Sequence, residues 1–84
     1  MTGSIYRINP KRLMVAVQTD VGGFSIFENI NHEDFDLGDQ VSWENDFTLG
    51  YGQIKNISKG FIADVYFQNH HVSKSNIQAQ LREE

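Results

Sequence analysis

Four residues near the N-terminus combine an aromatic ring with three cations: Tyr6, Arg7, Lys11 and Arg12. A tyrosine ring can stack on a nucleobase, and ammonium and guanidinium groups can neutralise phosphates. These residue types therefore suit a surface that binds a single-stranded nucleic acid. They are also common on ordinary protein surfaces, since a tyrosine serves equally well in an interface or a core and cations beside a turn are usually solvated. The sequence leaves both interpretations open.

Two further groups carry side chains that titrate or bind metals, namely His70-His71 and His32-Glu33-Asp34. Adjacent residues on a strand point to opposite faces, so the histidine pair does not form a metal site by itself. The second group lies in a polar segment where such residues are common. The chain has no cysteine, and it lacks a nucleophile elbow, a phosphate-binding glycine loop and a metalloprotease motif. We therefore expect neither an enzyme nor a bound cofactor or metal.

Charge is distributed unevenly along the chain. The 84 residues carry a formal net charge of −4, with 39% hydrophobic and 21% charged residues, as in ordinary globular domains. Residues 1–19 contain cations and no acid, whereas residues 28–46 contain acids and no lysine or arginine. The acidic middle argues against tight, nonspecific binding to nucleic acid, and it would suit a basic protein partner.

The size and composition predict one small domain, residues 1–84, in the cytoplasm. Without cysteine there is no disulfide framework. The N-terminus lacks the pattern of a signal peptide, and no apolar segment approaches the roughly 18 residues needed to span a membrane. We therefore expect no association with a membrane.

Alternating hydrophobic and polar residues predict an all-β protein. This period occurs in residues 11–19 and 61–67, and Gly22-Gly23 marks a hairpin turn between the second and third strands. Residues 29–37 have no sustained period and are expected to form a loop. Ser73 or Ser75 can cap a short helix. Its residues Ile77 and Leu81, with Val72, should dock on the sheet.

Two segments resemble parts of a known family. These are Gly3-Ser4-Ile5-Tyr6-Arg7-Ile8-Asn9-Pro10-Lys11 and Gly38-Asp39-Gln40-Val41-Ser42-Trp43-Glu44, which are similar to the first and fourth strands of cold-shock domains. The resemblance implies a five-stranded barrel of the OB type over residues 3–57, with residues 58–84 adding a strand and a C-terminal helix. It also implies binding of single-stranded RNA or DNA, with Phe24 and Phe27 at two aromatic positions of the family.

The chain departs from the family pattern at several binding positions. Residues 13–16 replace the aromatic second strand, and Ile26 stands where the family has histidine. If Phe24 and Ile26 face a ligand, Gly23 and Ser25 must face the core, which would be a poor core. The opposite register is compatible with burial, so the side to which Phe24 and Ile26 point stays open.

The predicted function is weak, non-enzymatic binding of single-stranded RNA or DNA. The candidate binding residues are Tyr6, Arg7, Lys11, Arg12, Phe24 and Phe27. The alternative is a protein-interaction module that keeps the barrel but has lost the nucleic-acid face, with the C-terminal helix or an open strand edge making the contact. Exposed aromatic rings beside Lys11 and Arg12 would favour nucleic acid, and buried rings would favour the alternative.

Overall fold

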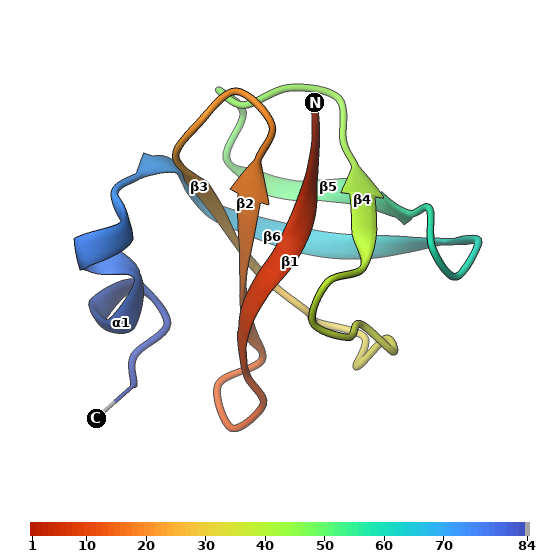
Figure 1. Cartoon of the computed structure of the whole chain (residues 1–84). Coiled ribbons are helices and arrows are strands. Elements are labelled where there is room, and N and C mark those ends of the chain that lie inside the picture. The colour runs from red at the N-terminus through yellow and green to blue at the C-terminus, as the bar shows by residue number, and fades with distance from the viewer. Residues whose placement is uncertain (84) are drawn as a thin grey trace.

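Six antiparallel strands form a closed barrel in the computed structural model, which describes residues 1–83 (Figure 1). The strands are β1 (Thr2–Asn9), β2 (Met14–Thr19), β3 (Phe24–Glu28), β4 (Gln40–Ser42), β5 (Gly50–Asn56) and β6 (Phe61–Val72). Their order around the barrel is β1-β2-β3-β6-β5-β4, and β4 pairs with β1 to close it. The prediction of a small all-β barrel with an added strand and helix is confirmed. The added strand is β6, and it is part of the barrel wall between β3 and β5.

Hydrophobic side chains from every strand fill the barrel interior. The period of two in β6 accounts for its contribution, because Ala63, Val65 and Phe67 all point inward while the residues between them do not. The interior cluster also contains Ile5, Val15, Val17, Phe27, Phe35, Val41, Trp43 and Ile54. Burial of this set is the main source of stability in a chain without disulfides.

A second hydrophobic cluster lies on the outside of the barrel, under the C-terminal segment. The chain leaves β6 through the 3₁₀ helix η1 (Lys74–Asn76) and the single-turn helix α1 (Ile77–Gln80), which lies beside β2 and β3 in Figure 1. The cluster consists of Met14, Ala16, Phe24, Ile26, Val72, Ile77 and Leu81. The predicted docking of Ile77, Leu81 and Val72 is confirmed. The Nδ2 atom of Asn9 also donates a hydrogen bond to the Leu81 carbonyl at 2.7 Å.

The second cluster answers the open question about β3. Phe27 belongs to the interior cluster, whereas Phe24 and Ile26 belong to the outer one. Phe24 and Ile26 therefore point away from the barrel interior, yet they are buried because the C-terminal segment covers them. A single core inside the barrel would bury only one face of β3, and the second cluster allows both faces to be apolar.

Within residues 1–83, no helix has the length and apolar character needed to cross a bilayer. Residue 84, the end of the predicted C-terminal extension, lies outside the described part of the chain.

Candidate functional site

The aromatic rings predicted to stack on bases are largely buried. Phe27 is fully enclosed in the barrel, and Phe24 is 6% exposed beneath the C-terminal segment. Tyr6 is 37% exposed, and its ring centroid lies 5.0 Å from that of Phe24, with the Lys74 Nζ atom 6.0 Å away. A base needs access to a ring face in order to stack. Phe24 and Phe27 therefore do not offer stacking surfaces in this structure, and Tyr6 offers a partial one.

The predicted cations, in contrast, do come together. Lys11 and Arg12, in the turn between β1 and β2, line a hollow of about 430 Å³ with Arg82, Asn9 and Glu83. Arg7 borders this region through an ion pair between its guanidinium and Glu83, at 2.7 Å. We call Arg7, Lys11, Arg12 and Arg82 the basic surface. Arg82 was not a predicted site residue, because only the docked C-terminal segment brings it beside the turn.

A buried serine–histidine pair resembles part of a catalytic arrangement but is closed to substrate. The Ser25 Oγ atom lies 2.8 Å from His70 Nδ1, a distance typical of a nucleophile and its base. Ser25 is fully buried, however, and His70 Nε2 hydrogen-bonds the Thr48 carbonyl at 2.9 Å. The geometry therefore supports a structural role, in which His70 links β3 and β6 to the segment that follows β4.

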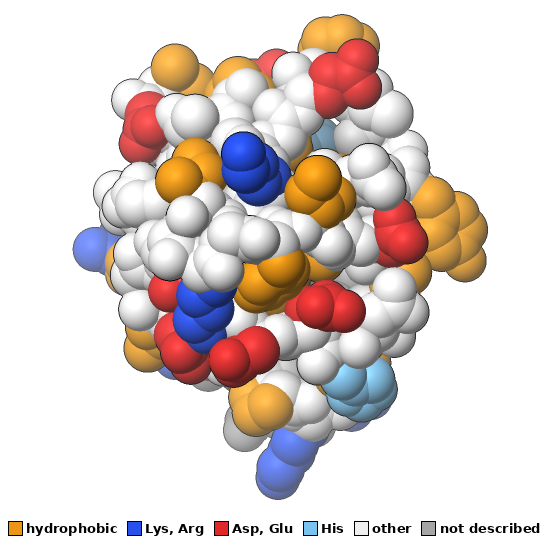
Figure 2. Space-filling view, turned by 90° about the vertical axis from the view of Figure 1, so that its right-hand side faces the viewer, with side chains coloured by type: hydrophobic (Ala, Val, Ile, Leu, Met, Phe, Trp, Pro, Cys, Tyr) orange, Lys and Arg blue, Asp and Glu red, His pale blue; other side chains and the backbone are white. Residues whose placement is uncertain are grey.

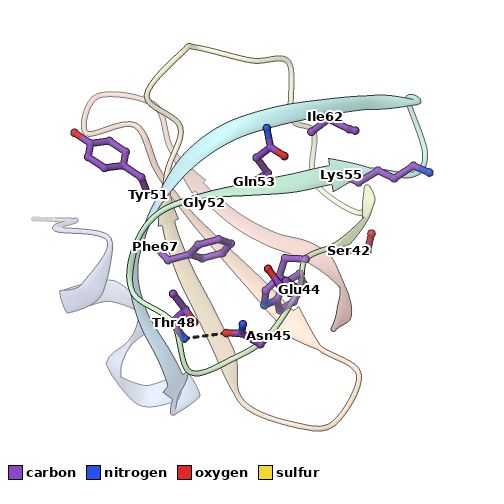
Figure 3. A pocket seen from close by; sticks show the side chains of 11 residues that line it. Ser42, Glu44, Asn45, Thr48, Tyr51, Gly52, Gln53, Lys55, Ile62 and Phe67 are labelled. Atoms are coloured by element: carbon purple, nitrogen blue, oxygen red, sulfur yellow. Dashed lines mark hydrogen bonds between the residues drawn. The ribbon is translucent and has the colours of Figure 1, made fainter.

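One hollow of the surface lies beside the short pairing of β4 with β5. β4 pairs with β5 only at Val41↔Asn56 and Ser42↔Lys55. The chain then diverges from β5 as a loop, residues 43–49, and returns at Gly50. A hollow of about 470 Å³ lies between this loop and β5, which we call the edge groove (Figure 3). It is lined by Ser42, Trp43, Glu44, Asn45, Thr48, Tyr51, Gly52, Gln53, Lys55, Ile62 and Phe67.

The floor of the edge groove is aromatic. In Figure 3 the Phe67 ring points into the space between β5 and the 43–49 loop, and Trp43 also lines the hollow. Gly52 makes room for this ring, since a Cβ atom there would lie 3.0 Å from Phe67 Cε2. The Nε1 atom of Trp43 is buried and has no hydrogen-bond partner among the described residues. Buried polar groups without a partner are rare.

The edge of β5 facing the groove has unpaired backbone groups. The Ile57 amide donates to the Gln40 carbonyl at 2.7 Å, so the backbone of Ile57 faces β4. Alternate residues of an antiparallel strand face the same neighbour, so the backbone groups of Gln53 and Tyr51 face that side too. Within residues 1–83 no hydrogen bond reaches these two backbone positions from the loop. The segment 50–54 is therefore an open strand edge.

Hydrogen bonds and an ion pair hold the 43–49 loop in position. His70 binds the Thr48 carbonyl, and His71 Nε2 lies 3.1 Å from the Asp46 carboxylate. Within the loop, the Asn45 side-chain oxygen accepts from the amides of Phe47 and Thr48. The adjacent histidines thus contact the same loop. The groove is formed in the free protein, because these contacts keep the loop apart from β5.

Large hydrophobic side chains are exposed on and beside the groove. Tyr51 and Ile62 line it and are 78% and 64% exposed, and Phe47 and Leu49 of the loop are also exposed. Figure 2 shows the face toward which the β5–β6 hairpin projects. Hydrophobic side chains lie near its centre, with acidic and basic ones around them. Apolar surface with a polar surround is typical of an interaction site.

The acidic middle of the chain is partly neutralised within the protein. The Lys59 Nζ atom lies 3.3 Å from Asp34, 2.6 Å from Asp36 and 3.4 Å from Asp39. The hydrogen bond to Asp36 is the largest of the influences that raise the pKa of Lys59 to about 12. Of the acids near the groove, Glu44 is exposed and forms no ion pair with the described residues.

Comparison with protein-family models, with curated protein sequences and with solved structures gives no match to this chain. The resemblance to cold-shock domains therefore stays a prediction from the motifs.

Proposed function

We propose that this chain is a non-enzymatic protein-interaction module that binds a partner protein at the edge groove. The burial of Phe24 and Phe27 favours this alternative over base stacking. The docked C-terminal helix has its apolar side chains buried in the outer cluster. This leaves the open strand edge as the better of the two contact surfaces expected for such a module.

The observation that carries the proposal is the short pairing of β4 with β5. Pairing ends at Ser42↔Lys55, so the groove combines unpaired backbone groups with an aromatic floor. Unpaired edges are surfaces to which other polypeptides bind, and proteins usually protect them. Here the edge is left open beside exposed Tyr51 and Ile62.

Site-specific photo-crosslinking in cells tests this proposal. A photoreactive amino acid replaces Tyr51 in one variant and Leu37, an exposed residue that does not line the groove, in the control. We expect a crosslinked protein at position 51 that is absent at position 37, and the purified partner should bind the wild-type chain in a titration. Equal crosslinking at both positions, or no binding by the purified partner, would contradict the proposal.

A second candidate function is weak binding of single-stranded RNA or DNA at the basic surface. The supporting observation is that Lys11, Arg12 and Arg82 line one hollow, with Tyr6 on the neighbouring strand β1. Phosphate contacts supply much of the affinity of nucleic-acid-binding proteins. In this mode Tyr6 is the one predicted aromatic residue with an exposed ring, so binding rests mainly on the cations.

A further inference from the structure

We infer that the partner at the edge groove is an extended segment of another protein, which adds to β5 as a strand. The inference rests on the proposed function and names the form that the partner takes.

The backbone of β5 presents a repeating set of donors and acceptors. The free amide and carbonyl groups of Tyr51 and Gln53 face the groove, and two residues of an antiparallel strand span about 6.8 Å. This is the spacing at which a paired strand repeats its hydrogen bonds. An extended backbone satisfies both positions at once, whereas a helix presents no free backbone groups to them.

The shape of the groove favours one strand over a second folded barrel. The 43–49 loop bounds the groove on the side opposite β5, and His70 and His71 hold it there. If the edge strand of another barrel entered the groove, the strands next to it in that barrel would collide with the 43–49 loop. A single extended segment instead occupies the position that a longer β4 would take. The hollow of about 470 Å³ is within the usual size of a binding site.

The side chains of the groove define the pattern of the segment. Alternate side chains of an added strand point to opposite faces of the sheet. Those pointing inward meet Trp43 and Phe67 on the aromatic floor, so a large apolar residue fits there. Those pointing outward lie beside Tyr51 and Ile62. Glu44 on the loop side and Lys55 on β5 both line the groove and form no ion pair with the described residues. A lysine or arginine of the segment complements Glu44 on the loop side, and an acidic residue complements Lys55 on β5.

A library of random ten-residue linear peptides displayed on phage tests the inference. We expect selected peptides with alternating apolar residues and at least one basic residue. Binding is then measured by fluorescence anisotropy with synthetic copies of the selected peptides. The variant Gln53→Pro removes the amide hydrogen that faces the groove. It breaks no hydrogen bond to β6, because the Gln53 nitrogen faces away from that ladder, and proline is tolerated at such edge positions.

The matched control is Gln53→Ala, which keeps the amide. Both substitutions remove the Gln53 side chain and its exposed hydrogen bond to Asp64. We expect Gln53→Pro to weaken peptide binding about tenfold or more, and Gln53→Ala to change it by less than about twofold. Amide hydrogen exchange of the wild-type chain provides a measurement that does not depend on a variant folding. The amides of Tyr51 and Gln53 should become protected when a selected peptide binds.

The outcomes separate this inference from the proposed function. If the selected peptides bind without protecting the amides of Tyr51 and Gln53 from exchange, strand addition to β5 is wrong. The proposed function as a protein-interaction module would then still stand. A library that yields no binder, together with failed crosslinking at position 51, would overturn both. If the chain forms a dimer in solution and the dimer protects the same two amides, the occupant of the groove is a second copy of this chain. This result would overturn the inference of a segment from another protein.

Discussion

The Nε2 atom of His70 lies 2.9 Å from the carbonyl oxygen of Thr48, and this contact joins strand β6 to the loop that bounds the edge groove. The same ring contacts Ser25 inside the protein. A buried imidazole therefore supports the outer boundary of the candidate site. The contact helps to hold Thr48, one of the residues that line the groove, in place.

Replacement of His70 should destabilise the protein and loosen the 43–49 loop. His70→Ala leaves the buried Ser25 hydroxyl without its partner, which should lower the free energy of unfolding by about 1–3 kcal/mol. Urea denaturation measures this change. His71→Ala is the control, because the His71 side chain is largely exposed and its ion pair with Asp46 is on the surface. Its effect should stay within about 0.5 kcal/mol. Equal effects of the two substitutions would contradict the structural role of His70.

The C-terminal segment should contribute strongly to stability. Leu81 is fully buried in the outer cluster, so Leu81→Ala should cost about 2–5 kcal/mol. Gln78→Ala, at an exposed position of α1, should have little effect. Thermal unfolding of the two variants provides the comparison. A melting temperature unchanged by Leu81→Ala would show that the segment is not docked.

The free energy of unfolding should fall at acidic pH as Asp39 becomes protonated. Burial alone raises the pKa of the Asp39 carboxyl, but hydrogen bonds from Asn56 and the Asp36 amide and the charge of Lys59 outweigh it, so the pKa lies below its ordinary value. A group with a lowered pKa in the folded state stabilises the fold above its ordinary pKa of 3.8, and the effect is lost as pH falls through the folded value. Urea denaturation between pH 6 and about pH 2.5 should show this loss, and Asp39→Asn should reduce it.

Nucleic-acid binding at the basic surface should depend only moderately on salt. Each phosphate neutralised on a single strand contributes a slope of about −0.7 in log K against log salt, so two or three contacts give a slope near −2. Lys11→Ala should make the slope shallower, and Tyr6→Ala should weaken binding without unfolding the chain. Fluorescence anisotropy with labelled mixed-sequence RNA and DNA at two salt concentrations measures both effects. Absence of binding at low salt and high micromolar protein would remove nucleic acid as a ligand.

The strands were predictable because their hydrophobic period is local. The alternation in residues 11–19 and 61–67 and the glycine turns depend on neighbouring residues only. The structure has β6 over 61–67, whereas the strand predicted over 11–19 begins only at Met14, because residues 11–13 form the turn after β1. Burial of the outer face of β3 depends instead on a contact with residues some 50 positions later in the chain. No local pattern in β3 reveals that Ile77 and Leu81 cover Phe24.

The edge groove was less predictable for a related reason. The sequence shows a strand near Val41 and another near Ile54, but it does not show where their pairing stops. That point depends on the path of the 43–49 loop, which contacts His70 and His71 of the distant strand β6 through a hydrogen bond and an ion pair. The basic surface was predictable in part, because Lys11 and Arg12 are close in sequence, whereas Arg82 joins them only through the fold.

Amide hydrogen exchange of the free protein, followed residue by residue by NMR, tests the open edge most directly. The account predicts that the amides of Tyr51 and Gln53 exchange rapidly, because they face the groove without a partner. The amide of Ile54, which faces β6 in the middle of its ladder, should be strongly protected in the same sample. Protection of Tyr51 and Gln53 equal to that of Ile54 would show that the edge is already paired, and it would contradict the proposal that a partner binds there.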